Sequence, residues 1–144
     1  MNLNVKKGNL FEFKKKGYYF VHCISSDCAM GAGIAVQFQK QFKLRNKLLL
    51  GDTSKGCVLV DGVFNLITKN KCWEKPTYQS LTYSIQKMLE IIGNDDSISK
   101  IAMPKIGCGL DRLQWGEVLA IIEREVLLFE SKNNRELDIE VRYL

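Results

Sequence analysis

A nearly continuous run of aromatic and β-branched residues, from Tyr18 to Ile24, constrains the fold of this chain most strongly. Such a run is typical of a strand that is buried on both faces, in the centre of a sheet covered by helices. It is followed by a small-residue segment that ends in Gly31-Ala32-Gly33, and then by a helical pattern of apolar residues from Ile34. This order of strand, glycine loop and helix places backbone donors and a helix N-terminus at the carboxyl end of the strand. The sequence therefore predicts an α/β fold, with small residues there either for close packing or for binding an anion.

A second glycine loop follows a second predicted strand, residues 97–103, and precedes a helical pattern from residue 114. Gly107 and Gly109 carry no Cβ and can adopt positive φ, so their backbone N–H groups can approach an anion or a sugar. Asp111 stands between these glycines and the helix. In this place its carboxylate is either a helix cap or a group that acts on a ligand, because open α/β sheets bind ligands at the carboxyl ends of strands. Two such loops predict a diphosphate or a nucleotide-sugar ligand.

Strands and helices alternate along the rest of the chain around one hairpin. The hairpin is predicted at Asp61-Gly62, a favoured two-residue turn, and Thr77 is the predicted N-cap of a long amphipathic helix. The last strand alternates apolar and charged residues, which predicts a half-exposed strand. The pattern predicts a mixed sheet between helix layers, with further strands at 3–5, 57–60, 63–68 and 137–143 and helices at 34–42, 44–50, 78–92 and 114–129.

Composition limits the classes of protein and of partner. The chain has 144 residues, 46% of them hydrophobic, which is enough for one core and one domain, residues 1–144. No stretch approaches the roughly 20 apolar residues of a membrane span, and the first residues lack a signal-peptide core, so we expect a cytoplasmic protein without membrane contacts. Five scattered cysteines and a single histidine fit neither a disulfide framework nor a zinc site, so we expect no metal. The net charge of +5 favours anionic partners such as phosphates, nucleotides or nucleic acid.

Three stretches resemble the macrodomain family, and within it the branch of terminal ADP-ribose protein glycohydrolases. Their order and spacing match over essentially the whole chain, whereas the Asn-Ala-Ala-Asn run and the triple glycine of most macrodomains are absent. The resemblance implies a three-layer α/β/α fold with a mixed, roughly six-stranded sheet and with ADP-ribose bound in a cleft above the strand ends. It implies no cofactor. The three stretches are His22–Ala35, Lys75–Tyr78 and Pro104–Trp115.

The resemblance also assigns ligand-binding roles. One side of the diphosphate is expected to lie against the first glycine loop, and the second loop is expected to wrap the other side and the distal ribose. Ser25 is expected beside the ribose. Asn9, next to Leu10, replaces the aspartate with which the family usually binds the adenine amino group; its amide oxygen can still accept that hydrogen bond, but without a charge. The loop residues that these roles include are Gly31, Ala32, Gly33, Ile34, Ile106, Gly107, Cys108, Gly109 and Leu110.

Lys75 and Asp111 match the two catalytic positions of this branch. A primary amine can attack the anomeric carbon of the distal ribose and hold it covalently, and a carboxylate can accept protons and activate water. Since a free lysine has a pKa of about 10.4, the attack must be accompanied by proton transfer to Asp111 or to the substrate, or the site must be dry. The residues alone suggest that Lys75 is a surface lysine. Lys69, Lys71 and Lys105 are its rivals, expected to be surface charges that attract phosphate.

The function expected from this resemblance is removal of terminal mono-ADP-ribose from modified macromolecules. The acceptors considered are acidic side chains of ADP-ribosylated protein and bases of ADP-ribosylated DNA, with ADP-ribose as ligand or product. Alternatives are an O-acetyl-ADP-ribose deacetylase or ADP-ribose phosphatase that acts on free metabolites, and an ADP-ribose-binding module without turnover. We expect the protein to be a monomer.

Overall fold

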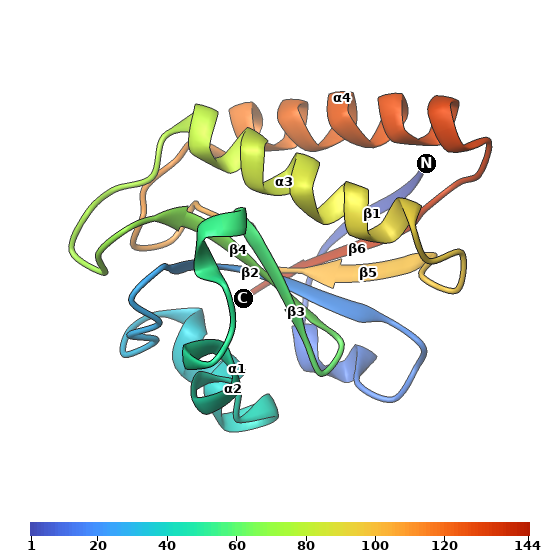
Figure 1. Cartoon of the computed structure of the whole chain (residues 1–144). Coiled ribbons are helices and arrows are strands. Elements are labelled where there is room, and N and C mark those ends of the chain that lie inside the picture. Colours follow the sequence, from blue (N-terminus) through green and yellow to red (C-terminus); the bar gives the residue numbers. More distant parts are fainter.

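A mixed six-stranded sheet in the order β1-β6-β5-β2-β4-β3 forms the centre of the molecule (Figure 1). The computed structural model describes residues 1–144. All neighbouring strands are parallel except β3 and β4, which form an antiparallel hairpin. The strands are β1 (Asn2–Lys7), β2 (Tyr19–Ser25), β3 (Cys57–Val60), β4 (Val63–Lys69), β5 (Lys100–Met103) and β6 (Asp138–Tyr143). The helices are α1 (Ile34–Phe42), α2 (Arg45–Leu49), α3 (Tyr78–Gly93) and α4 (Trp115–Asn133), with short 3-10 helices η1 (Leu10–Phe13) and η2 (Thr53–Lys55).

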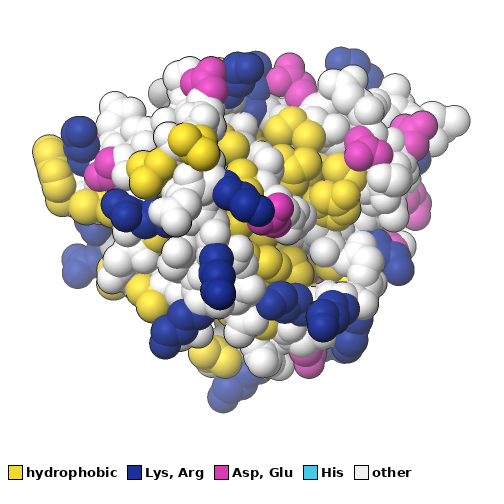
Figure 2. Space-filling view, turned by 60° about the horizontal axis from the view of Figure 1, so that its bottom comes forward, with side chains coloured by type: hydrophobic (Ala, Val, Ile, Leu, Met, Phe, Trp, Pro, Cys, Tyr) yellow, Lys and Arg dark blue, Asp and Glu magenta, His cyan; other side chains and the backbone are white.

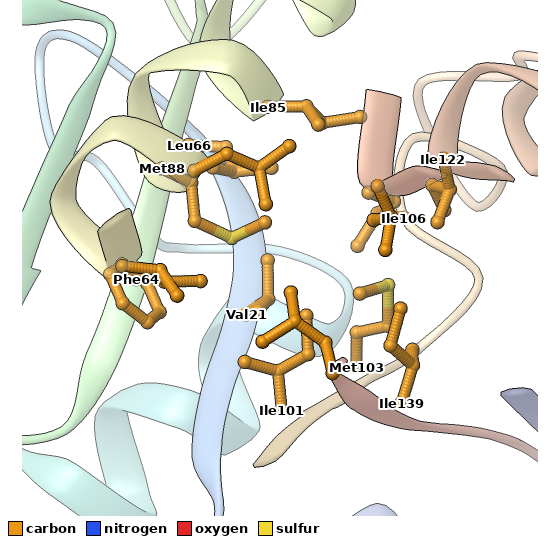
Figure 3. Packing of buried hydrophobic residues seen from close by; sticks show 14 of the residues in the cluster. Val21, Phe64, Leu66, Ile85, Met88, Ile101, Met103, Ile106, Ile122 and Ile139 are labelled. Atoms are coloured by element: carbon orange, nitrogen blue, oxygen red, sulfur yellow. The ribbon is translucent and has the colours of Figure 1, made fainter. Parts of the chain in front are cut away.

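Helices cover both faces of the sheet, which confirms the predicted three-layer α/β/α architecture. In Figure 1, α3 and α4 lie above the sheet, and α1, α2 and η1 lie below it. Each face has its own hydrophobic core. Figure 3 shows the upper core, where Val21 of β2 and Met103 of β5 meet Ile85 and Met88 of α3 and Ile122 of α4. Burial of these apolar side chains is the main force that holds the layers together.

Local sequence signals fix several element boundaries as predicted. Asp61 and Gly62 both have positive φ, 49° and 79°, as a two-residue hairpin turn of the mirror-image type requires. Thr77 caps α3: its hydroxyl accepts a hydrogen bond from the Ser80 N–H at 2.9 Å, and the Ser80 hydroxyl accepts one from the Thr77 N–H at 3.0 Å. The strand predicted from the run at 18–24 lies between β5 and β4, in the interior of the sheet.

Two strands differ from the prediction. The fifth strand begins at Lys100 instead of residue 97, because Asp95 accepts hydrogen bonds from the Ser97 and Ile98 N–H groups and holds that segment in a turn. The last strand, β6, is not half exposed: it lies between β1 and β5, and Arg142 is only 8% exposed. Arg142 lies against the η1 segment and pairs with Glu140 at 2.8 Å and Glu12 at 3.5 Å. The charge of Arg142 is therefore balanced by one carboxylate on β6 and one on η1.

None of the helices combines the length and the apolar character needed to cross a membrane. The five cysteines are all free, and no group of three or more His, Cys, Asp or Glu side chains is arranged to hold a metal ion. His22, the single histidine, is fully buried and stacks on Phe38 with 4.0 Å between ring centroids. Burial lowers the pKa of His22 to about 4, although its hydrogen bond to Asn65 opposes that shift. His22 is therefore a neutral core residue on the strand that leads to the site.

Candidate active site

A cleft of about 720 Å³ opens at the carboxyl ends of β2, β4 and β5. This is the edge at which parallel sheets bind ligands, and the volume is in the range of small-molecule sites. Both glycine loops line it, so the fold brings together two segments that are far apart in the sequence. The lining residues are Cys23–Ser25, Ala29–Ala35, Lys69, Cys72, Lys75, Pro104–Gly107 and Gly109–Arg112.

The first glycine loop presents the N-terminus of α1 to the cleft. Gly33 precedes the helix with φ 62° and ψ −150°, a conformation that favours glycine, and no side chain caps the helix there. A Cβ at this position would lie 3.3 Å from Cδ1 of Leu110, so the two loops are already in close contact. The first N–H groups of a helix have no partner within it and attract anions. Gly31, Ala32, Gly33 and Ile34 line the cleft, and their contacts with the diphosphate stay a prediction.

Asp27 holds this loop in place, a role that the sequence analysis missed. Its carboxylate accepts hydrogen bonds from the Ser25 hydroxyl, from the Ala29 N–H at 3.2 Å and from the Cys72 N–H at 3.0 Å. The hydrogen bond from Ser25 is the main reason that the pKa of the Asp27 carboxyl is lowered. Ser25 lines the cleft, and its predicted place beside the ribose stays a prediction. Its hydroxyl donates to Asp27, and the bond from the Cys72 N–H to the same carboxylate ties the first loop to the segment after β4.

The second glycine loop depends on Gly107. This residue has φ 72°, and a Cβ there would lie 2.9 Å from Cδ1 of Leu113, whose N–H donates to the Gly107 carbonyl at 2.8 Å. Gly109 does not have positive φ, so only the first of the two glycines needs the conformation expected for both. Ile106, Gly107, Gly109 and Leu110 line the cleft.

Lys75 and Asp111 both line the cleft, and they are linked through Leu110. The Lys75 Nζ donates a hydrogen bond to the Leu110 carbonyl at 2.8 Å, immediately before Asp111 in the chain. Asp111 does not cap α4; the N-cap residue is Gln114, without a side-chain hydrogen bond. The alternative reading of Asp111 as a helix cap is therefore wrong.

Asp111 has a different lysine as its ion-pair partner. The Lys69 Nζ lies 2.7 Å from Asp111 Oδ1, and the two side chains are only 13% and 16% exposed. The expectation that Lys69 is a surface charge is wrong. Lys69 is the last residue of β4 and lies opposite Ser25 in the register of β2 and β4, a placement that only the folded sheet shows. Lys105 is not a free surface charge either, because its Nζ lies 4.0 Å from the centroid of the Tyr143 ring, whereas Lys71 is exposed.

Three of the predicted ligand-binding residues do not line the cleft. Asn9 caps η1, where its side-chain oxygen accepts a hydrogen bond from the Phe11 N–H at 3.1 Å. Leu10 is buried in the hydrophobic core on the face of the sheet that α1 and α2 cover. Cys108 packs against the upper core, and burial raises its pKa. The ligand roles of these three residues remain predictions.

Cys23 also lines the cleft, on the strand that carries Ser25. Burial raises the pKa of its thiol, and the nearby carboxylate of Asp111 raises it further. A thiol in this state is a poor nucleophile, since the thiolate is the reactive form. Cys23 is therefore a weak candidate for the nucleophile, and the cleft also contains the amines of Lys69, Lys75 and Lys105.

The sequence and the fold were compared with known proteins. No protein-family model matches the chain. The chain is 44% identical over 134 residues to the ADP-ribose glycohydrolase OARD1 of Bos taurus, covering 90% of this chain and 85% of the relative. It is 45% identical over 122 residues to the Homo sapiens protein of the same name, covering 81% and 79%.

A solved structure, the macrodomain of Thermus aquaticus DarG, superimposes on this fold with a TM-score of 0.78 and 19% identity, covering 99% of this chain and 98% of that one. The structural likeness establishes the fold, and the sequence identity to OARD1 over most of both chains establishes the branch. The chain belongs to the macrodomain family, in the branch of the ADP-ribose glycohydrolases.

Proposed function

We propose that this protein is an ADP-ribosyl hydrolase that releases terminal ADP-ribose from acidic side chains of modified proteins, with Lys75 as nucleophile and Asp111 as proton acceptor. One observation carries the proposal: the Lys75 amine donates a hydrogen bond to the carbonyl of Leu110, the residue before Asp111, in a cleft that both glycine loops line. The names of the OARD1 relatives, at 44–45% identity, support the class of reaction. The N-terminus of α1 is well suited to hold the diphosphate of ADP-ribose.

In the first step, the Lys75 amine attacks the anomeric carbon of the distal ribose. A C–N bond forms, the C–O bond to the acceptor carboxylate breaks, and that carboxylate leaves with the bonding electron pair. The amine transfers a proton to the carboxylate of Asp111, the residue that follows the Leu110 carbonyl contacted by the amine. A covalent intermediate divides one difficult substitution into two easier ones.

In the second step, water attacks the same carbon. Asp111 returns the proton to the nitrogen of Lys75 as the C–N bond breaks, and its carboxylate takes a proton from the attacking water as ADP-ribose forms. Release of that proton to solvent restores the site. The hydrogen bond from Lys69 occupies Oδ1 of Asp111, and Oδ2 has no protein partner, so it is free for these transfers. Lys75 and Asp111 therefore have complementary roles in one cycle.

The test is release of ADP-ribose from a glutamate-linked substrate. We expect Lys75→Ala to abolish release while ADP-ribose still binds, because the diphosphate contacts lie in the glycine loops. Lys71→Ala is the matched control, since Lys71 is an exposed lysine of the same loop that does not line the cleft. Normal turnover by Lys75→Ala would rule out the lysine mechanism. O-acetyl-ADP-ribose assayed in parallel tests whether the same cleft also accepts free metabolites.

A second acceptor, ADP-ribosylated DNA, is favoured by the distribution of charge. Residues 1–55 carry 10 Lys and Arg against 3 Asp and Glu, whereas residues 56–144 carry 11 against 13. Figure 2 shows basic side chains spread over the lower part of the view, with few acidic ones among them. Lys40 on α1, Lys43 just after it and Arg45 on α2 are exposed members, and α1 itself begins at the cleft.

Phosphate contacts would make turnover on DNA depend steeply on salt. If DNA is an acceptor, we expect release of ADP-ribose from modified DNA, and we expect its rate to fall much more with rising salt than the rate on modified protein. The double variant Lys40→Glu, Lys43→Glu should then reduce turnover on modified DNA and leave turnover on modified protein unchanged. Absence of release from DNA at low salt would exclude this acceptor.

A further inference from the structure

Three lysines line the cleft, Lys69, Lys75 and Lys105, and only Lys69 contacts Asp111. Lys69 lies 2.7 Å from Asp111 Oδ1, whereas Lys75 donates to the Leu110 carbonyl. The Lys69–Asp111 ion pair is shielded from solvent. Its side chains are 13% and 16% exposed, whereas those of the surface ion pair Lys47–Asp61 are 59% and 47% exposed. Exposed pairs contribute little, but removing one partner from an enclosed pair leaves an uncompensated charge. The environment therefore favours a persistent contact between Lys69 and Asp111.

Lys69 is attached to the sheet, whereas Asp111 belongs to a loop. Lys69 ends β4, is in register with Ser25 of β2, and its carbonyl accepts a hydrogen bond from the Ser26 N–H at 2.9 Å. Asp111 follows the second glycine loop and precedes Arg112, which has a positive φ of 62°. The strand residue is thus the fixed member of the pair, and the loop residue is the one whose orientation it sets.

The partner of Asp111 matters to the nucleophile. A carboxylate paired directly with the Lys75 amine would stabilise the ammonium form, which cannot attack. With Oδ1 held by Lys69, the negative charge of Asp111 is balanced by a lysine that does not react. The second oxygen, Oδ2, then remains available to accept a proton once substrate is bound.

We infer that Lys69 is a positioning residue that orients Asp111 and keeps its carboxylate from pairing with Lys75. The inference rests on the proposed function, because it assigns a role within the same reaction. It distinguishes two of the lysines that line the cleft: Lys75 reacts with the sugar, and Lys69 acts only through Asp111.

The kinetic test compares Lys69→Met with Lys69→Arg, with Lys71→Met as the exposed-lysine control. We expect Lys69→Met to lower kcat roughly tenfold or more, as misplacement of a catalytic group does, with the Kd for ADP-ribose changed less than about twofold. Lys69→Arg should recover most of the rate, and the control should match the unaltered protein. A Kd weakened in parallel with the loss of rate would overturn the inference, because Lys69 would then contact the ligand itself.

A double-mutant cycle separates positioning from a general structural role. In the Asp111→Ala background, Lys69→Met should cause no further loss in the residual rate at which Lys75 becomes covalently modified, because Asp111 is the only group through which Lys69 acts. An equal loss in both backgrounds would overturn the inference. Thermal unfolding of each variant shows whether the compared proteins are folded.

Crystal structures give a readout that does not depend on turnover. In Lys69→Met, the Asp111 carboxylate should leave its original rotamer and approach the Lys75 amine. An Asp111 side chain in its original place would contradict the inference even if the protein is an active hydrolase. Conversely, an inactive unaltered protein would refute the proposed function, while a displaced Asp111 in the variant would still support the positioning role.

Discussion

At the residue scale, Gly33 is the point at which the two glycine loops touch. We predict that Gly33→Val weakens ADP-ribose binding about tenfold or more and destabilises the fold by about 1–3 kcal/mol. The residue has φ 62°, which a β-branched side chain rarely adopts, and the new Cβ would lie 3.3 Å from Leu110 Cδ1. Titration calorimetry measures the binding. Gly116→Ala, in the open first turn of α4, is the control and should bind normally; equal affinity of both variants would mean that this loop does not approach the ligand.

His22 gives a prediction about pH. Its pKa is lowered from 6.5 to about 4 in the folded chain. Between pH 6.5 and 4, the histidine is therefore protonated in the unfolded chain and neutral in the folded chain. The free energy of unfolding should therefore fall as pH drops from about 6.5 to 4, by an amount on the order of 3 kcal/mol. Urea unfolding at several pH values measures it.

The control for this prediction is His22→Gln, whose side chain can still donate to Asn65 but does not titrate. This variant should be less stable overall, because it loses the stacking on Phe38, and should show a flatter dependence on pH over the same interval. A steep slope that persists in His22→Gln would assign the effect to another group. Asp27 is not that group, since its lowered pKa affects stability only at pH values near or below the ordinary aspartate range.

The limits of the sequence are clearest at this scale. Lys75 and Asp111 were identified through their resemblance to a family motif, and the structure places both in one cleft. Lys69 was expected to be a surface charge because nothing local distinguishes it from its neighbours. Its pairing with Asp111 joins residues 42 positions apart, and depends on the register of β4 against β2 and on the path of the second glycine loop. Neither is encoded in a short motif.

At the element scale, the start of α3 is fastened to the second glycine loop. The Lys75 Nζ donates to the Leu110 carbonyl, and the Gln114 N–H donates to the Tyr78 hydroxyl at 2.9 Å. The capping box of Thr77 and Ser80 fixes where the helix begins, and therefore where Lys75 lies. The cap could be predicted from the sequence, whereas the contact with the loop could not, because it requires β4 and β5 to be placed in the sheet first.

We predict that Tyr78→Phe lowers kcat several-fold and destabilises the protein by about 1 kcal/mol, the usual contribution of one hydrogen bond. The lost hydroxyl would free the end of the loop that carries Asp111. Tyr83→Phe is the matched control on the same helix, since no hydrogen bond of its hydroxyl is recorded. If both variants retained full kcat, the contact between Tyr78 and the loop would have no part in catalysis.

At the scale of the whole molecule, the order of buried strands, glycine loops and amphipathic helices was sufficient to predict a mixed sheet between two helix layers. The position of β6 was not predictable in the same way. Alternation along Leu137, Ile139 and Val141 indicates which side chains face the core, but it does not say which strands lie on either side or that η1 covers the other face. Contacts between distant segments decide that, and the same kind of contact builds the cleft.

The central claim is that the Lys75 amine and the Asp111 carboxylate act on the same carbon of bound ADP-ribose. The most direct measurement is the intact mass of Asp111→Ala after incubation with a glutamate-linked ADP-ribosyl substrate and reduction with borohydride, which fixes an amine–sugar adduct. The claim predicts a gain of one reduced ADP-ribosyl group, located on Lys75 by peptide mapping and absent from the double variant with Lys75→Ala. An unchanged mass, or an adduct on Lys69, would contradict it.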